Sequence, residues 1–137
     1  MFTQIVYTSK AIPNLSNKDI FDILRTSVEQ NAKHNVTGFL LYNKGRFRQV
    51  IEGLDADIQQ LYNNIKHDAR HNVYITNLEI QINDRDFPMW AMGLCSEHVK
   101  PFENHPYMFS FEMFDELHNH SKAKSIQLLK EFINGKN

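Results

Sequence analysis

The pattern of apolar and polar positions along the first 97 residues predicts a regular succession of strands and helices. Alternation with a period of two residues indicates strands, and apolar spacings of three and four residues indicate amphipathic helices. The predicted strands cover residues 3–9, 36–42, 45–52, 73–82 and 87–94. The predicted helices cover residues 17–33 and 55–67. The order of elements is therefore β-α-β-β-α-β-β.

Short local signals support these boundaries. Ser16 followed by Asp19 is an aspartate-bearing form of the capping box that opens a helix. The link Asn43-Lys44-Gly45 between two strands is typical of a hairpin. Pro88 lies near the start of the last predicted strand, where a proline is tolerated.

This order predicts an α+β fold, a ferredoxin-like sandwich with both helices on one face of the sheet. The remaining segment is too apolar for a free tail, and residues 121–133 have the spacing of a helix. We expect this segment to cover the other face of the sheet, which would otherwise be an exposed apolar patch. Residues 1–97 are thus the predicted core, and residues 98–137 a helical extension of the same domain. The apolar side chains that lead into the extension are Phe109, Phe111, Met113 and Phe114.

Composition narrows the class of protein. A chain of 137 residues suits one domain, and a formal net charge of -1 without a basic cluster argues against direct nucleic-acid binding. No apolar run is long enough to span a bilayer, and the N-terminus lacks the pattern of a signal peptide. Cys95 is the one cysteine, so an internal disulfide is excluded, and the histidines show no metal-ligand spacing. A soluble cytoplasmic protein without a metal site is expected.

Polar residues occupy positions where the first helix should be apolar. Ser27 and Asn31 share a stripe with Ile23 and Leu24, so both face inward. A buried amide or hydroxyl that lacks a partner costs about 1–3 kcal/mol. These groups either bond to backbone, as structural residues, or contact a ligand.

Two strands contain similar exceptions. Gln49 lies between Phe47 and Ile51 on one face of its strand, and Tyr7 lies beside Ile5 on the first strand. If these strands are neighbours, the Tyr7 hydroxyl and the Gln49 amide can reach each other, either as a structural bridge or as part of a binding site. A planar ligand between the two helices would satisfy these groups and Asn31 together. In that case Ile23 and Ile65 could pack on its two faces.

Read together, four segments resemble one known family. They are IVYTSKA, SVEQNAKHNVTGFLLYNKGRFRQVIEG, HDARH and FPMWAMG. Their succession and spacing are similar to those of the BLUF family of flavin-binding blue-light sensors, over residues 2–95. The final segment resembles the C-terminal helices of small stand-alone BLUF proteins.

The resemblance implies a flavin, FAD or FMN, between the two helices. It implies that Tyr7 donates an electron and a proton to the excited flavin and that Gln49 then changes its hydrogen bonding, with a small red shift in absorption. Asn31 would bond the carbonyl and imide edge of the ring. Arg70 matches an arginine that contacts the flavin, and His71 follows it as in the family.

The resemblance also implies a relay. Trp90 and Met92 match residues that carry the rearrangement into the fifth strand, and Ser27 matches a serine able to bond the tryptophan. Gln30 is a candidate flavin contact that departs from the family, because Asn or His is commoner beside the matched Asn31. Ala69 likewise replaces a frequent proline.

These features predict a sensor rather than an enzyme, which signals to a cytoplasmic regulatory protein or through a homo-oligomer. One alternative is an acyl-phosphate hydrolase, but residues 10–16 contain Lys10 and no glycine for a phosphate cradle. A second is a BLUF-like module that binds a partner without photochemistry. A third is a flavin-dependent oxidoreductase, which would need an open substrate site at the edge that Tyr7 and Gln49 would occupy.

Overall fold

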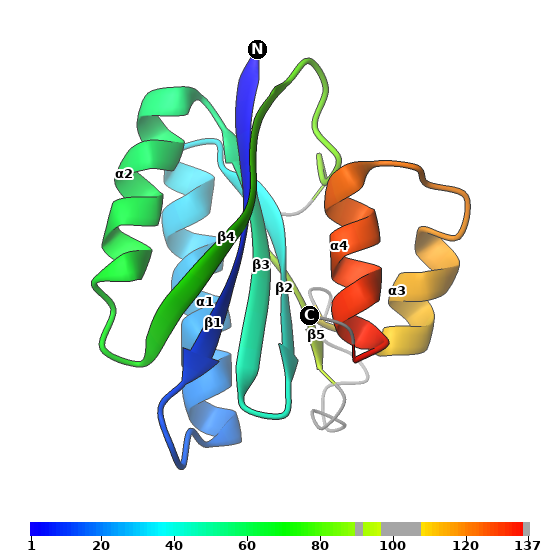
Figure 1. The fold of residues 1–137 in the computed structure, drawn as a ribbon. Coiled ribbons are helices and arrows are strands. Elements are labelled where there is room, and N and C mark those ends of the chain that lie inside the picture. Colours follow the sequence, from blue (N-terminus) through cyan, green and yellow to red (C-terminus); the bar gives the residue numbers. More distant parts are fainter. Residues whose placement is uncertain (90–91, 97–107, 136–137) are drawn as a thin grey trace.

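A mainly antiparallel sheet forms the middle layer of the protein (Figure 1). The structure is a computed structural model, and it describes residues 1–89, 92–96 and 108–135. Within these residues the strands have the order β4-β1-β3-β2-β5-β6. Strand β5 pairs in parallel with β2, and β6 pairs in parallel with β5, whereas the other pairs are antiparallel. The strands are β1 (Phe2–Ala11), β2 (Thr37–Asn43), β3 (Arg46–Gly53), β4 (His71–Ile82), β5 (Gly93–Ser96) and β6 (Met108–Phe109).

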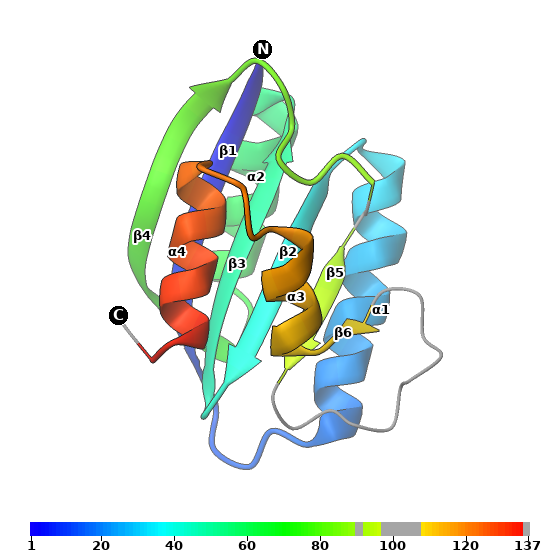
Figure 2. The same cartoon turned by 90° about the vertical axis from the view of Figure 1, so that its right-hand side faces the viewer.

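Helices cover both faces of this sheet. Figure 1 shows α1 and α2 on one side and α3 and α4 on the other, and Figure 2 looks onto the second pair. The predicted ferredoxin-like arrangement and the predicted cover from the C-terminal segment are therefore confirmed. Within the described ranges, none of the helices is long and apolar enough to cross a membrane. The helices are α1 (Asn17–Lys33), α2 (Asp55–Lys66), α3 (Phe111–Leu117) and α4 (Lys124–Ile133).

The local signals act as predicted. The Ser16 hydroxyl accepts from the Asp19 amide at 3.1 Å, and the Asp19 carboxylate accepts from the Ser16 amide at 3.0 Å, so α1 begins with a complete capping box. The β2–β3 hairpin turns at Lys44 and Gly45, which both have positive φ. This is the conformation of a two-residue type I′ turn, whose twist suits the flanking strands.

The last predicted strand is placed differently. Strand β5 begins at Gly93 rather than at residue 87, and Phe87 lies before it with its amide bonded to the Glu52 carboxylate at 2.6 Å. A side chain, not a neighbouring strand, thus satisfies this backbone group. Helix α3 and strand β6 were not predicted; Phe111 begins α3, and Phe114 is fully buried beneath it. The division at residue 97 stays a prediction.

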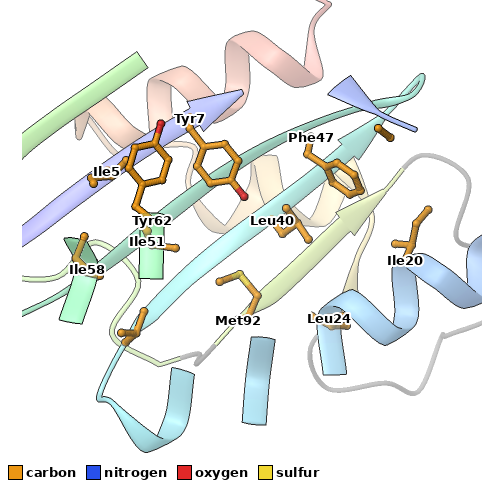
Figure 3. Packing of buried hydrophobic residues seen from close by; sticks show 12 residues of the cluster. Ile5, Tyr7, Ile20, Leu24, Leu40, Phe47, Ile51, Ile58, Tyr62 and Met92 are labelled. Carbon is orange, nitrogen blue, oxygen red and sulfur yellow. The ribbon is translucent and has the colours of Figure 1, made fainter. Parts of the chain in front are cut away.

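Two apolar clusters lie on opposite faces of the sheet. Ile5, Tyr7, Phe47 and Ile51 belong to the cluster beneath α1 and α2, part of which Figure 3 shows. Because side chains of successive strand residues alternate between faces, their neighbours on β1 and β3 belong to the second cluster, beneath α3 and α4. That cluster contains Val6, Phe39, Leu41, Val50, Phe87, Phe114, Ile126, Leu129 and Phe132.

Candidate functional site

A cavity of about 150 Å³ lies on the face of the sheet that α1 and α2 cover. Its walls come from both helices, from the middle strands and from the connection after α2. Apolar side chains and amides share the lining, which suits a flat ligand with polar edges. The predicted site residues that line it are Tyr7, Ile23, Ser27, Gln30, Asn31, Gln49, Ile65, Arg70 and His71.

Tyr7 and Gln49 form the centre of this cavity's floor. They are direct partners in the antiparallel β1–β3 ladder, as the sequence predicted, and both are buried. The Tyr7 hydroxyl donates to Gln49 Oε1, and Gln49 Nε2 donates to Met92 Sδ at 3.3 Å. In Figure 3 the hydroxyl end of the Tyr7 ring is directed toward the side of the sheet where Met92 lies. Gln49 therefore connects the first strand with the residue just before β5.

The surroundings of Tyr7 keep its phenol protonated. Burial is the main cause that raises the pKa of Tyr7 above its usual value of 10.0, and the nearby Tyr62 and Asp68 raise it further. The rings of Tyr7 and Tyr62 have centroids 5.5 Å apart, while the Tyr62 hydroxyl is hydrogen-bonded to Thr76. Tyr7 is therefore a neutral phenol that donates its proton in the hydrogen bond to Gln49.

Helix α1 contributes one wall. Asn31 is buried, whereas Ser27 and Ile23 are half-buried at the cavity. Gln30 lines the cavity from an exposed position. Asn31 and Ser27 therefore face inward, as predicted from the helical stripe. Both line the cavity instead of packing in a closed core.

His71 is held as a neutral ring. Its Nε2 lies 3.1 Å from the Ile65 carbonyl, which can only accept, so Nε2 carries the proton. Its Nδ1 then accepts from the Ser9 hydroxyl at 2.6 Å. Burial lowers the pKa of His71, which agrees with this neutral form. His71 thus fastens α2 to β1 at the edge of the cavity.

Arg70 forms an ion pair at the cavity lining. Its Nη2 donates to Asp68 Oδ2 at 2.7 Å and its Nε to Asp68 Oδ1 at 3.0 Å. Hydrogen bonds from Arg70 hold the pKa of Asp68 below its usual range, and this carboxylate raises the pKa of Arg70. The guanidinium is thus fixed as a cation beside the cavity, with part of its surface open to solvent.

Several lining residues were missed from the sequence. Asp68 could have been found, since it lies within the HDARH segment two residues before Arg70. The others lie on ordinary helix or strand patterns and carry no separate signal. They are Thr26, Leu40, Phe47, Leu61 and Asn64.

Part of the predicted relay can be described. Met92 is fully buried, lies just before β5, and accepts a hydrogen bond from Gln49, a contact that was not predicted. Trp90 lies outside the described residues, and so does any bond between it and Ser27.

Comparison with known proteins decides the family. A family model described as "Sensors of blue-light using FAD" matches residues 2–93, which include the whole cavity lining and Met92. The chain belongs to the BLUF family. BLUF domains bind flavin, and the cavity fits that cofactor: Ile23 and Ile65 offer apolar contacts, while the buried amides of Asn31 and Gln49 offer hydrogen bonds.

Relatives of very different length match this chain. The chain is 34% identical over 98 residues to the photoactivated adenylate cyclase subunit beta of Euglena longa, which covers 71% of this chain and 11% of that protein. It is 31% identical over 71 residues to the blue light- and temperature-regulated antirepressor BluF of Escherichia coli, covering 52% and 18%. It therefore spans only a small fraction of these relatives. The dark-state structure of the BLUF protein BlrB is instead similar along its whole length, with a TM-score of 0.70, 25% identity and coverage of 98% and 96%.

Proposed function

We propose that this BLUF protein senses blue light through Tyr7 and Gln49 and signals to a partner through β5 and the C-terminal helices. The observation that carries the proposal is the chain of two hydrogen bonds from Tyr7 through Gln49 to Met92. When bound, the flavin supplies the absorption of blue light and accepts an electron.

Tyr7 is the proposed donor of that electron and of its phenolic proton. Its raised pKa means that a proton is present at neutral pH, and Gln49 is the hydrogen-bond partner next to it. Both the electron and the proton return to Tyr7 afterwards, so no net redox change occurs. What persists is a changed arrangement of the Gln49 amide.

A changed Gln49 amide would alter its contact with Met92. A thioether sulfur accepts hydrogen bonds but cannot donate them. Rotation of the amide by half a turn would place Oε1 where Nε2 now donates to Met92 Sδ, and this hydrogen bond would be lost. Met92 immediately precedes β5, so the change at Gln49 reaches the strand proposed to carry the signal.

The other cavity residues are proposed to hold the flavin. Asn31 and Gln30 would bond its polar edge, Ile23 and Ile65 would pack on its faces, and Arg70 would contact it from the connection after α2. The cofactor is FAD, with FMN as the alternative. His71 would hold α2 against β1 beside the flavin through its hydrogen bonds with Ser9 and Ile65.

The proposed output is regulatory rather than enzymatic. The match to Escherichia coli BluF, a protein named as an antirepressor, supports a regulatory protein as the partner. A cytoplasmic location and a homo-oligomer as the acting form are further parts of the proposal. The matched part of the cyclase relatives is a small share of their length, which supports a sensor role for this domain.

The test is a visible absorption spectrum of the flavin-loaded protein, recorded in darkness and after blue light. We expect a small reversible red shift that Gln49→Leu abolishes while the flavin stays bound. Gln81→Leu, an exposed change on β4, is the matched control and should keep the shift. A flavin spectrum that does not change under blue light would reject the photochemical proposal. It would favour a module that binds a partner without photochemistry.

A further inference from the structure

A second set of buried polar side chains lies on the opposite face of the sheet, beneath α4. Glu52 is fully buried, yet no Lys or Arg side chain in the described residues pairs with its carboxylate. Burial raises the pKa of Glu52, opposed by hydrogen bonds from its neighbours. Burying a carboxyl group costs free energy unless its oxygen atoms accept hydrogen bonds. The donors of these hydrogen bonds therefore show which segments Glu52 connects.

Two of the four donors to Glu52 are backbone amides of the connection between β4 and β5. Oε1 accepts from the Phe87 amide at 2.6 Å, and Oε2 accepts from the Asp86 amide at 3.0 Å. Thr37 Oγ1 donates to Oε1 at 3.2 Å, and Gln4 Nε2 donates to Oε2 at 3.1 Å. Glu52, near the end of β3, therefore accepts hydrogen bonds from two consecutive backbone amides of this connection.

Asp86 joins the same connection to α4. Its Oδ2 accepts from Gln4 Nε2 at 2.7 Å and from Ser125 Oγ at 2.7 Å. Ser125 lies in the first turn of α4 and is fully buried. A carboxylate near the start of a helix is also favoured by the helix dipole. Glu52, Asp86 and Ser125, called here the carboxylate junction, thus link β3, the β4–β5 connection and α4.

The carboxylate junction and the light-sensing site both include residues of β3 and of the connection between β4 and β5. Glu52 follows Gln49 on β3 and points to the other face of the sheet, because strand side chains alternate. Phe87 precedes Met92 on the connection into β5. Two residues of this connection therefore have partners outside it. Met92 accepts a hydrogen bond from Gln49, and Asp86 accepts one from Ser125.

We propose that the carboxylate junction is the coupling element that carries the movement of Met92 to α4, with Asp86 and Ser125 as positioning residues. The two amide contacts of Glu52 limit independent movement of Asp86 and Phe87, so that a shift of Met92 is not lost in a loose connection. The strain that reaches Asp86 then acts on the first turn of α4 through the hydrogen bond from Ser125. This inference rests on the proposed function, since it needs Gln49 to change its contact with Met92.

The test is hydrogen exchange of the full flavin-loaded chain, measured by mass spectrometry in darkness and under blue light, with the absorption spectrum taken on the same samples. Ser125→Ala removes the hydroxyl that donates to Asp86 and places a good helix former in α4. Asp86→Ala removes the acceptor but keeps the amide that Glu52 holds. Ser121→Ala, outside the junction and next to the same helix, is the matched control.

In the natural protein we expect light to change the exchange of residues 124–133. Ser125→Ala and Asp86→Ala should each abolish this change and keep the full red shift, and the double variant should add nothing further. Ser121→Ala should keep both responses.

Two results from the variants would overturn the coupling but not the photochemistry: a light response in α4 that survives both junction variants, or its equal loss in Ser121→Ala. An α4 that never responds in the natural protein, despite a normal red shift, would also overturn it and leave the photochemistry intact. Absence of the red shift itself would reject the proposed function, and this inference with it.

Discussion

The two faces of the sheet both contain buried polar side chains, but the described groups on each face have different surroundings. Beneath α1 and α2, Tyr7, Gln49 and Asn31 border a cavity. Beneath α3 and α4, Arg48 donates to Thr8 Oγ1 and to the Leu128 carbonyl, both at 2.8 Å, and neither Arg48 nor Thr8 lines that cavity. We call this second face the closed face, because its described buried polar groups pair with one another.

The difference shows what a buried polar residue can and cannot indicate. Polar groups that satisfy one another hold elements together, and their partners are visible in the protein. Polar groups around a hollow still have surface to offer a ligand. Polarity in the core therefore points to a binding site only when it adjoins space, and the following predictions separate the two cases.

The largest effect is expected at Tyr7. Tyr7→Phe keeps the ring but removes the proton and the hydrogen bond to Gln49, so the light-induced red shift should vanish completely. The measurement is the difference spectrum between lit and dark samples. Tyr62→Phe is the matched control because it alters a neighbouring tyrosine that bonds Thr76 instead, and it should keep the shift. Loss of the shift in both variants would contradict a specific role for Tyr7.

Arg48 tests the closed face. Arg48→Met should remove two hydrogen bonds and the stacking of the guanidinium on Phe132, where 5.2 Å separates it from the ring centroid. We expect a loss of about 3 kcal/mol in the free energy of unfolding, measured with urea, and an unchanged red shift. Arg25→Met, on the exposed side of α1, should change stability by less than about 0.5 kcal/mol. If Arg48→Met lost the red shift but kept normal stability, Arg48 would act in light sensing rather than in holding the closed face together.

Glu52 should give the closed face a distinctive pH dependence. Burial raises its folded pKa above the usual 4.5, so the folded state binds the proton more tightly than the unfolded chain. This contribution to stability is present below pH 4.5 and is lost as the pH rises through the folded pKa. Urea titrations across this range should therefore show a flatter pH profile for Glu52→Gln than for the natural protein. Glu79→Gln, at an exposed position, should leave the profile unchanged.

His71 should give the cavity face the opposite slope. Burial lowers its folded pKa below 6.5, so the unfolded chain binds the proton more tightly. The contribution is complete above pH 6.5 and is lost as the pH falls through the folded pKa. His71→Gln should reduce this loss of unfolding free energy on acidification, whereas the exposed His120→Gln should not. An equal response of the two variants would contradict the assignment.

Most of the fold could be predicted because it follows from repeating local patterns. The capping box of Ser16 and Asp19, the turn at Lys44 and Gly45 and the helical stripe of α1 each depend on residues close in sequence. The predicted pair of Tyr7 and Gln49 needed one further assumption, that β1 and β3 are neighbours, and the ladder confirms it. The last strand was misplaced because Glu52, distant in sequence, holds the amides of residues 86 and 87.

By itself, the sequence determined which side chains break the apolar pattern and, through its four motifs, the family to which the chain belongs. Only the tertiary structure decided which of these groups border a cavity and which pair with each other. Glu52 is an example, since in the sequence it is only the last residue of the strand predicted over residues 45–52. Its role depends on donors from Gln4, Thr37 and the β4–β5 connection, which come together only when the chain is folded. Periodicity reports the face on which a side chain lies, but its partners are set by long-range packing.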